Sequence, residues 1–406
     1  MADAKSDIIF LPISTDYYFF VLYLFENQLD MRYLLLFLFL PLIVQAQDLT
    51  EDSVLDVTLS WDQAPNGYIY SVEIFVPDDM PPTGGYPVCI ALHGNGGNGI
   101  QVLESMSNLL DCHIIVAPSG YENSWSICEE DSKGPDVQML EELIESLKVY
   151  DNVNSNRIRL VGSSNGSALV NNFYIQNDDP SVDRVCGIVS QMNEPQFHGE
   201  EFHYPASGPN PDADYCGYDT SKEILVGRKY LSICNDNDGL IPFEGGPSVV
   251  GVDFIPAEDA IFKIAEVQGF SGSQIAPGGS PIGNPLIFEY VYLDGDVILL
   301  RGNANHGTNS SQREYLKDWL GDCDFSSNTE DKSRADIRWF PNPFSSVLSI
   351  NLINIPSSNF ELINIEGQVV YAGVLTEGLQ EFDLNVLAKG VYILKFNEKS
   401  KVIVKQ

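Results

Sequence analysis

Residues 158–166 read IRLVGSSNG and place Ser164 at the centre of a Gly-x-Ser-x-Gly motif, directly after a run of β-branched and apolar residues. This arrangement is typical of a nucleophile elbow, in which a strand turns sharply into a helix and exposes the serine hydroxyl. The two glycines permit the tight turn, and residues 165–174 can form the helix. Because any strand-to-helix turn with small residues can give the same pattern, the prediction depends on three further segments.

The first segment lies upstream of the elbow. Residues 86–92, YPVCIAL, have the continuous apolar character of a buried strand in a parallel sheet, and HGNGGNG follows at 93–99. Glycines let such a loop approach a carbonyl under attack, so the backbone N–H groups of Asn95 and Asn165 are the predicted oxyanion donors. A phosphate-binding loop is the alternative, but the segment lacks the lysine of that motif.

The second segment is another strand pattern, KYLSIC at 229–234, which runs into the acidic loop NDNDGLIP at 235–242. A carboxylate in this loop, from Asp236 or Asp238, could orient a catalytic histidine and stabilise its protonated form. A solvated turn or a weak calcium loop would have a similar composition. No bidentate glutamate follows at the spacing of a calcium loop.

The third segment supplies the base. His306 follows the strand pattern of residues 296–300 and is the one histidine of five that comes after both the serine and the acidic loop. The resulting order of serine, acid and histidine is that of α/β-hydrolases, and an imidazole can accept and return a proton near neutral pH. The residues predict two-step acyl transfer that needs neither a metal nor an organic cofactor.

Residues 67–324 resemble the secreted family of feruloyl esterases and poly(3-hydroxybutyrate) depolymerases. The matching motifs are the His-Gly loop at 92–97, PSGYENSW at 118–125, the strand NRIRLV at 156–161 and DGLIPFEGG at 238–246. The last motif selects Asp238 over Asp236. The sequence departs from the family pattern at Cys234-Asn235, at Ser163 and Asn165, and at Gly307-Thr308.

The resemblance implies an α/β-hydrolase with a mostly parallel central sheet. Its implied activity is serine carboxylic ester hydrolysis of feruloyl, acetyl or polyester bonds, and the implied substrate is an ester-decorated polysaccharide or a polyester. Trp125 is predicted to form a wall of the substrate site, with a core position as the alternative. Residues 196–218 have the composition of an insertion over the site, or of a simple surface loop. A binding protein that keeps the fold without activity is the alternative function; the complete triad argues against it.

The N-terminal segment predicts export. Residues 31–46 have the charged start, apolar core and small-residue exit of a signal peptide, with cleavage expected after Ala46. Residues 1–30 are interpreted as an overlong start before Met31. An uncleaved membrane anchor is the alternative, but the apolar run of residues 34–44 is short for a span.

The C-terminal segment is a separate unit. A polar linker at 325–335 follows the esterase domain of residues 47–324, and residues 336–406 contain short strand patterns suited to a small all-β sandwich. This unit resembles the type A sorting domain of type IX secretion, through FPNPF at 340–344, GQVV at 367–370, LAKGVY at 387–392 and KVIVK at 401–405. A carbohydrate-binding module is the alternative. The resemblance implies type IX secretion as a partner and an extracellular or cell-surface location.

Composition limits the partners. The 406 residues carry a formal net charge of −35, which disfavours nucleic acid, anionic membranes and polyanionic glycans but not neutral polymers. Seven cysteines allow disulfides in an exported protein and leave at least one unpaired. Cys89, within a buried strand, is predicted to be a free thiol.

Overall fold

The computed structural model describes residues 47–321, 336–340, 344, 346–396 and 399–405. The predicted leader, signal peptide and linker lie outside these residues. Within the described residues, no helix has the length and apolar character needed to cross a membrane.

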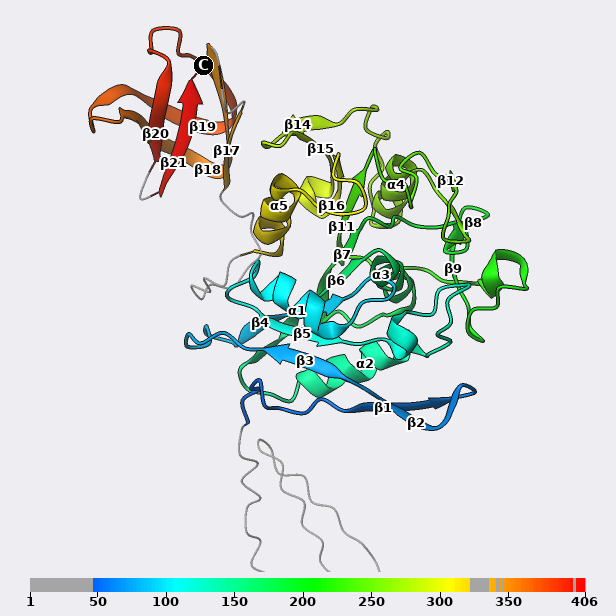
Figure 1. Cartoon of the computed structure of the whole chain (residues 1–406). Coiled ribbons are helices and arrows are strands. Elements are labelled where there is room, and N and C mark those ends of the chain that lie inside the picture. Colours follow the sequence, from blue (N-terminus) through cyan, green and yellow to red (C-terminus); the bar gives the residue numbers. More distant parts are fainter. Residues whose placement is uncertain (1–46, 322–335, 341–343, 345, 397–398, 406) are drawn as a thin grey trace, which may run out of the picture. The chain divides into compact units, whose positions relative to one another are not determined.

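A nine-stranded mixed sheet forms the centre of residues 47–321 (Figure 1). Its order is β14-β15-β16-β11-β7-β6-β4-β5-β3, and the six strands from β16 to β5 run parallel to one another. β14, β15 and β3 add antiparallel pairs at the two edges. The strands are β3 (Val72–Phe75), β4 (Tyr86–Leu92), β5 (Ile114–Pro118), β6 (Val153–Ser163), β7 (Val182–Ile188), β11 (Lys229–Asn235), β14 (Ser280–Ile282), β15 (Ile287–Tyr292) and β16 (Val297–Gly302). The predicted mostly parallel α/β sheet is confirmed.

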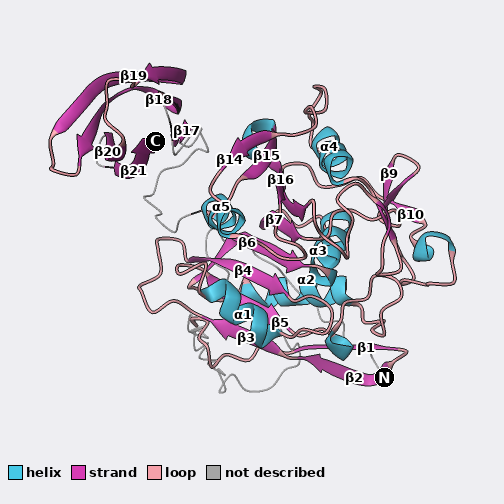
Figure 2. Ribbon diagram, turned by 45° about the horizontal axis from the view of Figure 1, so that its top comes forward, coloured by secondary structure: helices cyan, strands magenta, loops and turns pink. Residues whose placement is uncertain are grey.

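Helices cover both faces of this sheet (Figure 2). The helices are α1 (Gly99–Ser107), α2 (Asp136–Leu147), α3 (Asn165–Gln176), α4 (Ala257–Val267) and α5 (Ser310–Leu320). In β4, alternate residues such as Val88 and Ile90 join the core beneath α2, α3 and α4, whereas Cys89 and Ala91 join the core beneath α1 and α5. Because both faces are covered, β4 is buried at every position.

Shorter ribbons surround the sheet. They are the hairpin β1 (Val57–Trp61) with β2 (Ala64–Tyr70), the three strands β8 (Phe197–His198), β9 (Glu201–Tyr204) and β10 (Thr220–Ser221), and the pair β12 (Gly246–Pro247) with β13 (Asp253–Phe254).

The C-terminal region is all-β, as predicted. It forms a five-stranded antiparallel sheet of β17 (Asp336–Phe340), β18 (Val347–Asn364), β19 (Val369–Asp383), β20 (Gly390–Phe396) and β21 (Lys399–Lys405). The first half of β18 pairs with β17 and its second half with β20. Leu348 from the first half and Phe360 from the second belong to the same hydrophobic core, so both halves of β18 contribute apolar side chains to one interior.

The cysteines among the described residues separate into those in disulfides, which include Cys112, and free thiols. Cys128 and Cys216 form a disulfide. Cys89, Cys186 and Cys234 are buried free thiols, so the prediction for Cys89 is confirmed.

Candidate active site

Ser164 lies at a sharp turn between β6 and α3, in the backbone conformation φ 56°, ψ −120°. Its N–H donates to the carbonyl of Ile188 on the neighbouring strand at 2.8 Å. A Cβ on Gly162 would lie 2.1 Å from the Gly166 oxygen, and a Cβ on Gly166 would lie 2.5 Å from the His93 oxygen. The predicted elbow is present, and close backbone approach explains why glycine stands on both sides of the serine.

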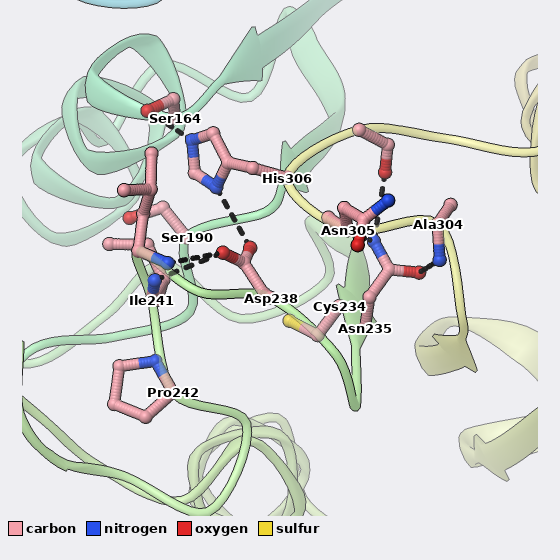
Figure 3. Close-up of polar contacts among 12 residues, drawn as sticks. Ser164, Ser190, Cys234, Asn235, Asp238, Ile241, Pro242, Ala304, Asn305 and His306 are labelled. Atoms are coloured by element: carbon pink, nitrogen blue, oxygen red, sulfur yellow. Dashed lines mark hydrogen bonds and ion pairs between the residues drawn. The ribbon is translucent and has the colours of Figure 1, made fainter.

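The structure brings Ser164, Asp238 and His306 together from three separate loops (Figure 3). His306 Nε2 lies 2.8 Å from Ser164 Oγ, and His306 Nδ1 lies 2.8 Å from Asp238 Oδ2. A carboxylate accepts, so Nδ1 carries the proton and Nε2 presents its lone pair to the serine hydroxyl. This is the arrangement in which a serine can be deprotonated by the imidazole.

The loop after β11 fixes the orientation of the Asp238 carboxylate. Asp238 Oδ1 accepts from the N–H groups of Leu240 at 2.9 Å and Ile241 at 3.1 Å, which leaves Oδ2 for the histidine. The side chain is only 2 % exposed. Asp236, the competing candidate, instead accepts from Arg301 Nε at 2.6 Å.

Two asparagines hold the His306 loop, and neither belongs to the predicted site residues. The buried Asn235 amide donates to the carbonyls of Asn305 at 2.8 Å and Gly307 at 2.9 Å and accepts from Ala304 N–H at 3.1 Å. Asn237 donates to Asn305 Oδ1 and accepts from Asn305 N–H, both at 2.9 Å. Asn235 is one of the departures from the family pattern, and that departure was the available signal.

The two predicted oxyanion donors lie beside the nucleophile. Asn165 is the first residue of α3, and Asn95 follows Gly94, at which an added Cβ would lie 3.4 Å from Ser164 Cβ. Within the described residues, neither the Asn95 nor the Asn165 backbone N–H donates to a protein acceptor. Both N–H groups are therefore without an acceptor among the described residues, and their role as oxyanion donors stays a prediction. An open hollow borders this loop, lined by His93, Gly94, Asn95, Gly96, Gly97, Gln101, Val102 and Ser163.

His93 supports the oxyanion loop through both ring nitrogens. Its Nε2 accepts from Gly120 N–H at 3.0 Å, so Nδ1 carries the proton and donates to the Gly94 oxygen at 2.7 Å. Burial lowers the pKa of His93, against a smaller raising effect of the hydrogen bond to Gly94. The ring is therefore neutral and supports the loop.

The prediction that Trp125 contacts substrate is wrong. The side chain is 0 % exposed, and its Nε1 donates to the His93 oxygen at 2.8 Å. Its ring packs on the His93 ring, with the two ring centres 4.6 Å apart. A buried indole needs a hydrogen-bond acceptor, and here the chain itself provides one. Trp125 belongs to the alternative class of core tryptophans.

Residues 196–218 are anchored to the elbow helix. Gln196 is fully buried and donates to the Ala168 oxygen at 2.9 Å and to Asn172 Oδ1 at 2.8 Å. The imidazole of His198 stacks between His203 and Tyr215, with ring centres 3.9 Å apart on each side. This segment is therefore a structured part of the domain, and its effect on substrate choice stays a prediction.

Within the part of the chain that the structure describes, no group of three or more His, Cys, Asp or Glu side chains could hold a metal ion.

Sequence comparison identifies the C-terminal region. Residues 338–406 match the family of secretion system C-terminal sorting domains. This match indicates type IX secretion and an extracellular or cell-surface location. No curated protein shows significant sequence similarity to the chain.

Structural comparison finds esterases among the similar solved structures. An acetyl xylan esterase from Aspergillus awamori is 14% identical with a TM-score of 0.40, and the match covers 62% of this chain and 93% of that chain. A Bacillus cereus carboxylesterase has the same identity and coverage with a TM-score of 0.38. A Mesorhizobium loti carboxylesterase is 12% identical with a TM-score of 0.37, covering 62% and 94%. Similarities this low carry no argument about activity.

The fold class rests on the molecule itself. A mostly parallel sheet covered by helices on both faces, a serine on the strand-to-helix turn after β6, and a following acid loop and histidine loop define the α/β-hydrolase fold. Residues 47–321 therefore have the α/β-hydrolase fold, and residues 338–406 match a secretion sorting domain.

Proposed function

We propose that the protein is a secreted serine carboxylic ester hydrolase. The observation that carries the proposal is the continuous hydrogen-bonded line from Ser164 Oγ through His306 to the buried Asp238, with 2.8 Å at each step. Two free backbone N–H groups beside the serine, on Asn95 and Asn165, support it. A binding protein without activity would have no need to keep this geometry.

The proposed reaction has two steps. Ser164 Oγ attacks the ester carbonyl while its proton passes to His306 Nε2, and the oxyanion is bound by the Asn95 and Asn165 N–H groups. The tetrahedral adduct breaks its bond to the alkoxy oxygen, which takes the proton from His306 and departs as the alcohol. Water then attacks the acyl carbon while its proton passes to His306 Nε2, the bond from that carbon to Ser164 Oγ breaks, and Oγ takes the proton from His306 as the carboxylic acid is released. Asp238 stabilises the imidazolium in both steps.

The substrate class follows from the surface and the sorting domain. A net charge of −35 repels polyanions, whereas a neutral polymer carrying ester groups would encounter no such barrier. An exported enzyme meets polymers outside the cell. We therefore propose feruloyl or acetyl esters of a polysaccharide, or a polyester of the poly(3-hydroxybutyrate) type, as substrates.

The proposal is tested by hydrolysis of p-nitrophenyl acyl esters, methyl ferulate, acetylated xylan and poly(3-hydroxybutyrate) by the full secreted chain and its Ser164→Ala variant. We expect activity on at least one ester and its loss in the variant. Absence of activity on every ester, in a protein that melts cooperatively, would contradict the proposal. The preferred member of the panel identifies the acyl group.

A further inference from the structure

The side chain of Asn165 is fully engaged by the protein although it borders the nucleophile. Its Oδ1 accepts from Trp125 N–H at 2.7 Å, and its Nδ2 donates to the Trp125 carbonyl at 3.0 Å. This pair of opposed hydrogen bonds copies the pattern between neighbouring strands and fixes the amide in one orientation. The side chain therefore has no spare polar atom directed at a substrate.

Glu130 extends this contact. Its Oε1 accepts from Asn165 Nδ2 at 3.0 Å, and its Oε2 accepts from the N–H groups of Ile127 at 3.1 Å and Cys128 at 2.6 Å. Cys128 is bonded to Cys216 in the disulfide. The carboxylate thus ties the start of α3 to a loop that is covalently anchored elsewhere in the domain.

Trp125 connects the same network to the opposite side of the nucleophile. Its indole donates to the His93 oxygen at 2.8 Å, and His93 holds Gly94 through its own ring nitrogen. Asn95 is the next residue. One tryptophan therefore contacts the Asn165 side chain through its main chain and the Asn95 loop through its ring.

We propose that Asn165, Trp125 and Glu130 form a positioning network that sets the spacing between the two oxyanion donors. This inference rests on the proposed esterase function and adds a role for side chains that do not touch the reacting atoms. An oxyanion site works only when its donors are held at the position of the developing charge. Through the network, one buried residue, Trp125, holds both the backbone at Asn165 and the loop before Asn95.

The test changes the amide without changing its size. Asn165→Asp places an oxygen 3.0 Å from both the Trp125 carbonyl and Glu130 Oε1, so we expect kcat for p-nitrophenyl acetate to fall about 100-fold, the scale of a lost oxyanion donor. Asn165→Ala removes the contacts without repulsion, and we expect a fall of about tenfold. KM should change less than twofold in each.

Glu130→Gln provides a reciprocal variant. The glutamine oxygen can still accept from the N–H groups of Ile127 and Cys128. Its nitrogen, however, is a donor that faces the donor Asn165 Nδ2, so the contact is lost and kcat should fall. In the double variant Asn165→Asp/Glu130→Gln, the glutamine nitrogen donates to the new carboxylate. We expect roughly tenfold recovery relative to Asn165→Asp, because directly contacting residues couple.

Asn177→Ala is the matched control. Asn177 follows the last residue of the same helix and binds Arg228 and Glu141, so its loss should lower Tm without lowering kcat. The affinity for phenylboronic acid, whose adduct on Ser164 directs an oxygen at the donors, should fall in parallel with kcat only in the Asn165 and Glu130 variants.

The outcomes separate the two proposals. Full kcat and boronate affinity in Asn165→Asp and Asn165→Ala, with an active wild type and an inactive Ser164→Ala variant, would overturn the positioning network alone. A wild type whose rate equals that of Ser164→Ala would overturn both. If Asn165→Asp fails to fold, Asn165→Ala and Glu130→Gln decide the same question.

Discussion

Ser164 Oγ and His306 Nε2 lie 2.8 Å apart, but the segments that carry these two residues are held in place by different kinds of contact. At the elbow, steric contact limits Gly162 and Gly166. The backbone of Gly162 lies against the Gly166 carbonyl, and that of Gly166 lies against the carbonyls of Leu92 and His93. The loop of residues 302–307 is held by side-chain amides, because Asn235 and Asn237 bind its main chain. Gly162 and Gly166 at the elbow should therefore be sensitive to added atoms, and residues 303–307 of the histidine loop to removal of the asparagine amides that bind them.

The largest effect is expected from Gly166→Ala. The new Cβ would lie 2.5 Å from the His93 oxygen and 2.6 Å from the Leu92 oxygen, and backbone atoms cannot move aside cheaply. We expect the free energy of unfolding to fall by about 1–3 kcal/mol and kcat/KM to fall about 1000-fold, because both oxyanion donors shift. Urea unfolding and ester hydrolysis measure the two effects.

Gly307→Ala is the control from the histidine loop. Its Cβ would lie 3.5 Å from the Ala304 oxygen, an ordinary contact, so activity within threefold of wild type is expected. Equal losses in the two alanine variants would contradict the steric contrast between the segments.

The next largest effect is expected from Asn235→Ala. This change leaves two loop carbonyls and the buried Gln312 amide without their partner, and a displacement of the imidazole by about 1 Å can cost about 100-fold in rate. We expect kcat to fall by that factor. Asn235→Asp keeps the acceptor for Ala304 N–H and Gln312 but places an oxygen 2.8 Å from the Asn305 carbonyl and 2.9 Å from the Gly307 carbonyl, so its rate should fall at least as far as that of Asn235→Ala. If Asn235→Ala has a rate equal to or above that of wild type, the loop of residues 302–307 keeps its conformation without the Asn235 amide.

A smaller effect is expected from Asn237→Ala. Asn237 is exposed and contacts the loop only at Asn305, so water can replace its hydrogen bonds at a net cost of about 1 kcal/mol or less. We expect kcat/KM to fall about two- to threefold. A loss as large as that of Asn235→Ala would mean that the exposed contact, and not the buried one, sets the histidine position.

The smallest effect on activity is expected at Asp136, on the elbow side. Its buried carboxyl accepts from Ser126 N–H at 2.7 Å, next to Trp125, and burial raises its pKa to about 7. Because the folded state binds this proton more tightly than the unfolded state, the stabilisation is complete below about pH 4 and is lost as pH rises to about 7. Wild type should therefore lose more stability than Asp136→Asn between pH 4.5 and 7.5 in urea unfolding. Parallel pH profiles for the two proteins would exclude this linkage.

The contrast between the segments also explains what the sequence could reveal. Ser164 was recognisable because only glycine fits at 162 and 166, and such steric limits restrict residue type locally. His306 follows from the strand pattern and the chain order, whereas the family motif at residues 238–246 selects Asp238 over Asp236. Asn235 stands out in the sequence only as a departure from the family pattern, because its partners lie 70 and 72 residues away and an amide does not indicate which distant acceptors it binds. Trp125 was misassigned because composition does not reveal whether an indole finds its acceptor in the chain or in a substrate.

The fold divides in the same way. The parallel strands could be predicted because burial on both faces requires continuous apolar runs such as residues 86–92. The antiparallel edge strands β14 and β15 could not, because short half-exposed strands at a sheet edge have no comparable pattern.

The three free thiols among the described residues bear on how the exported chain acquires its correct disulfides. Cys89, Cys186 and Cys234 lie on the central strands β4, β7 and β11, and burial raises the pKa of Cys89 and Cys234 to about 12. Thiol exchange proceeds through the thiolate, so these sulfurs are withdrawn from oxidation once the sheet has formed. In an oxidising compartment the order of events therefore matters: the sheet must form before oxidation is complete, so that Cys128 meets Cys216 rather than a core thiol. Variants that slow formation of the sheet should therefore accumulate incorrect disulfides even though all their catalytic residues are intact.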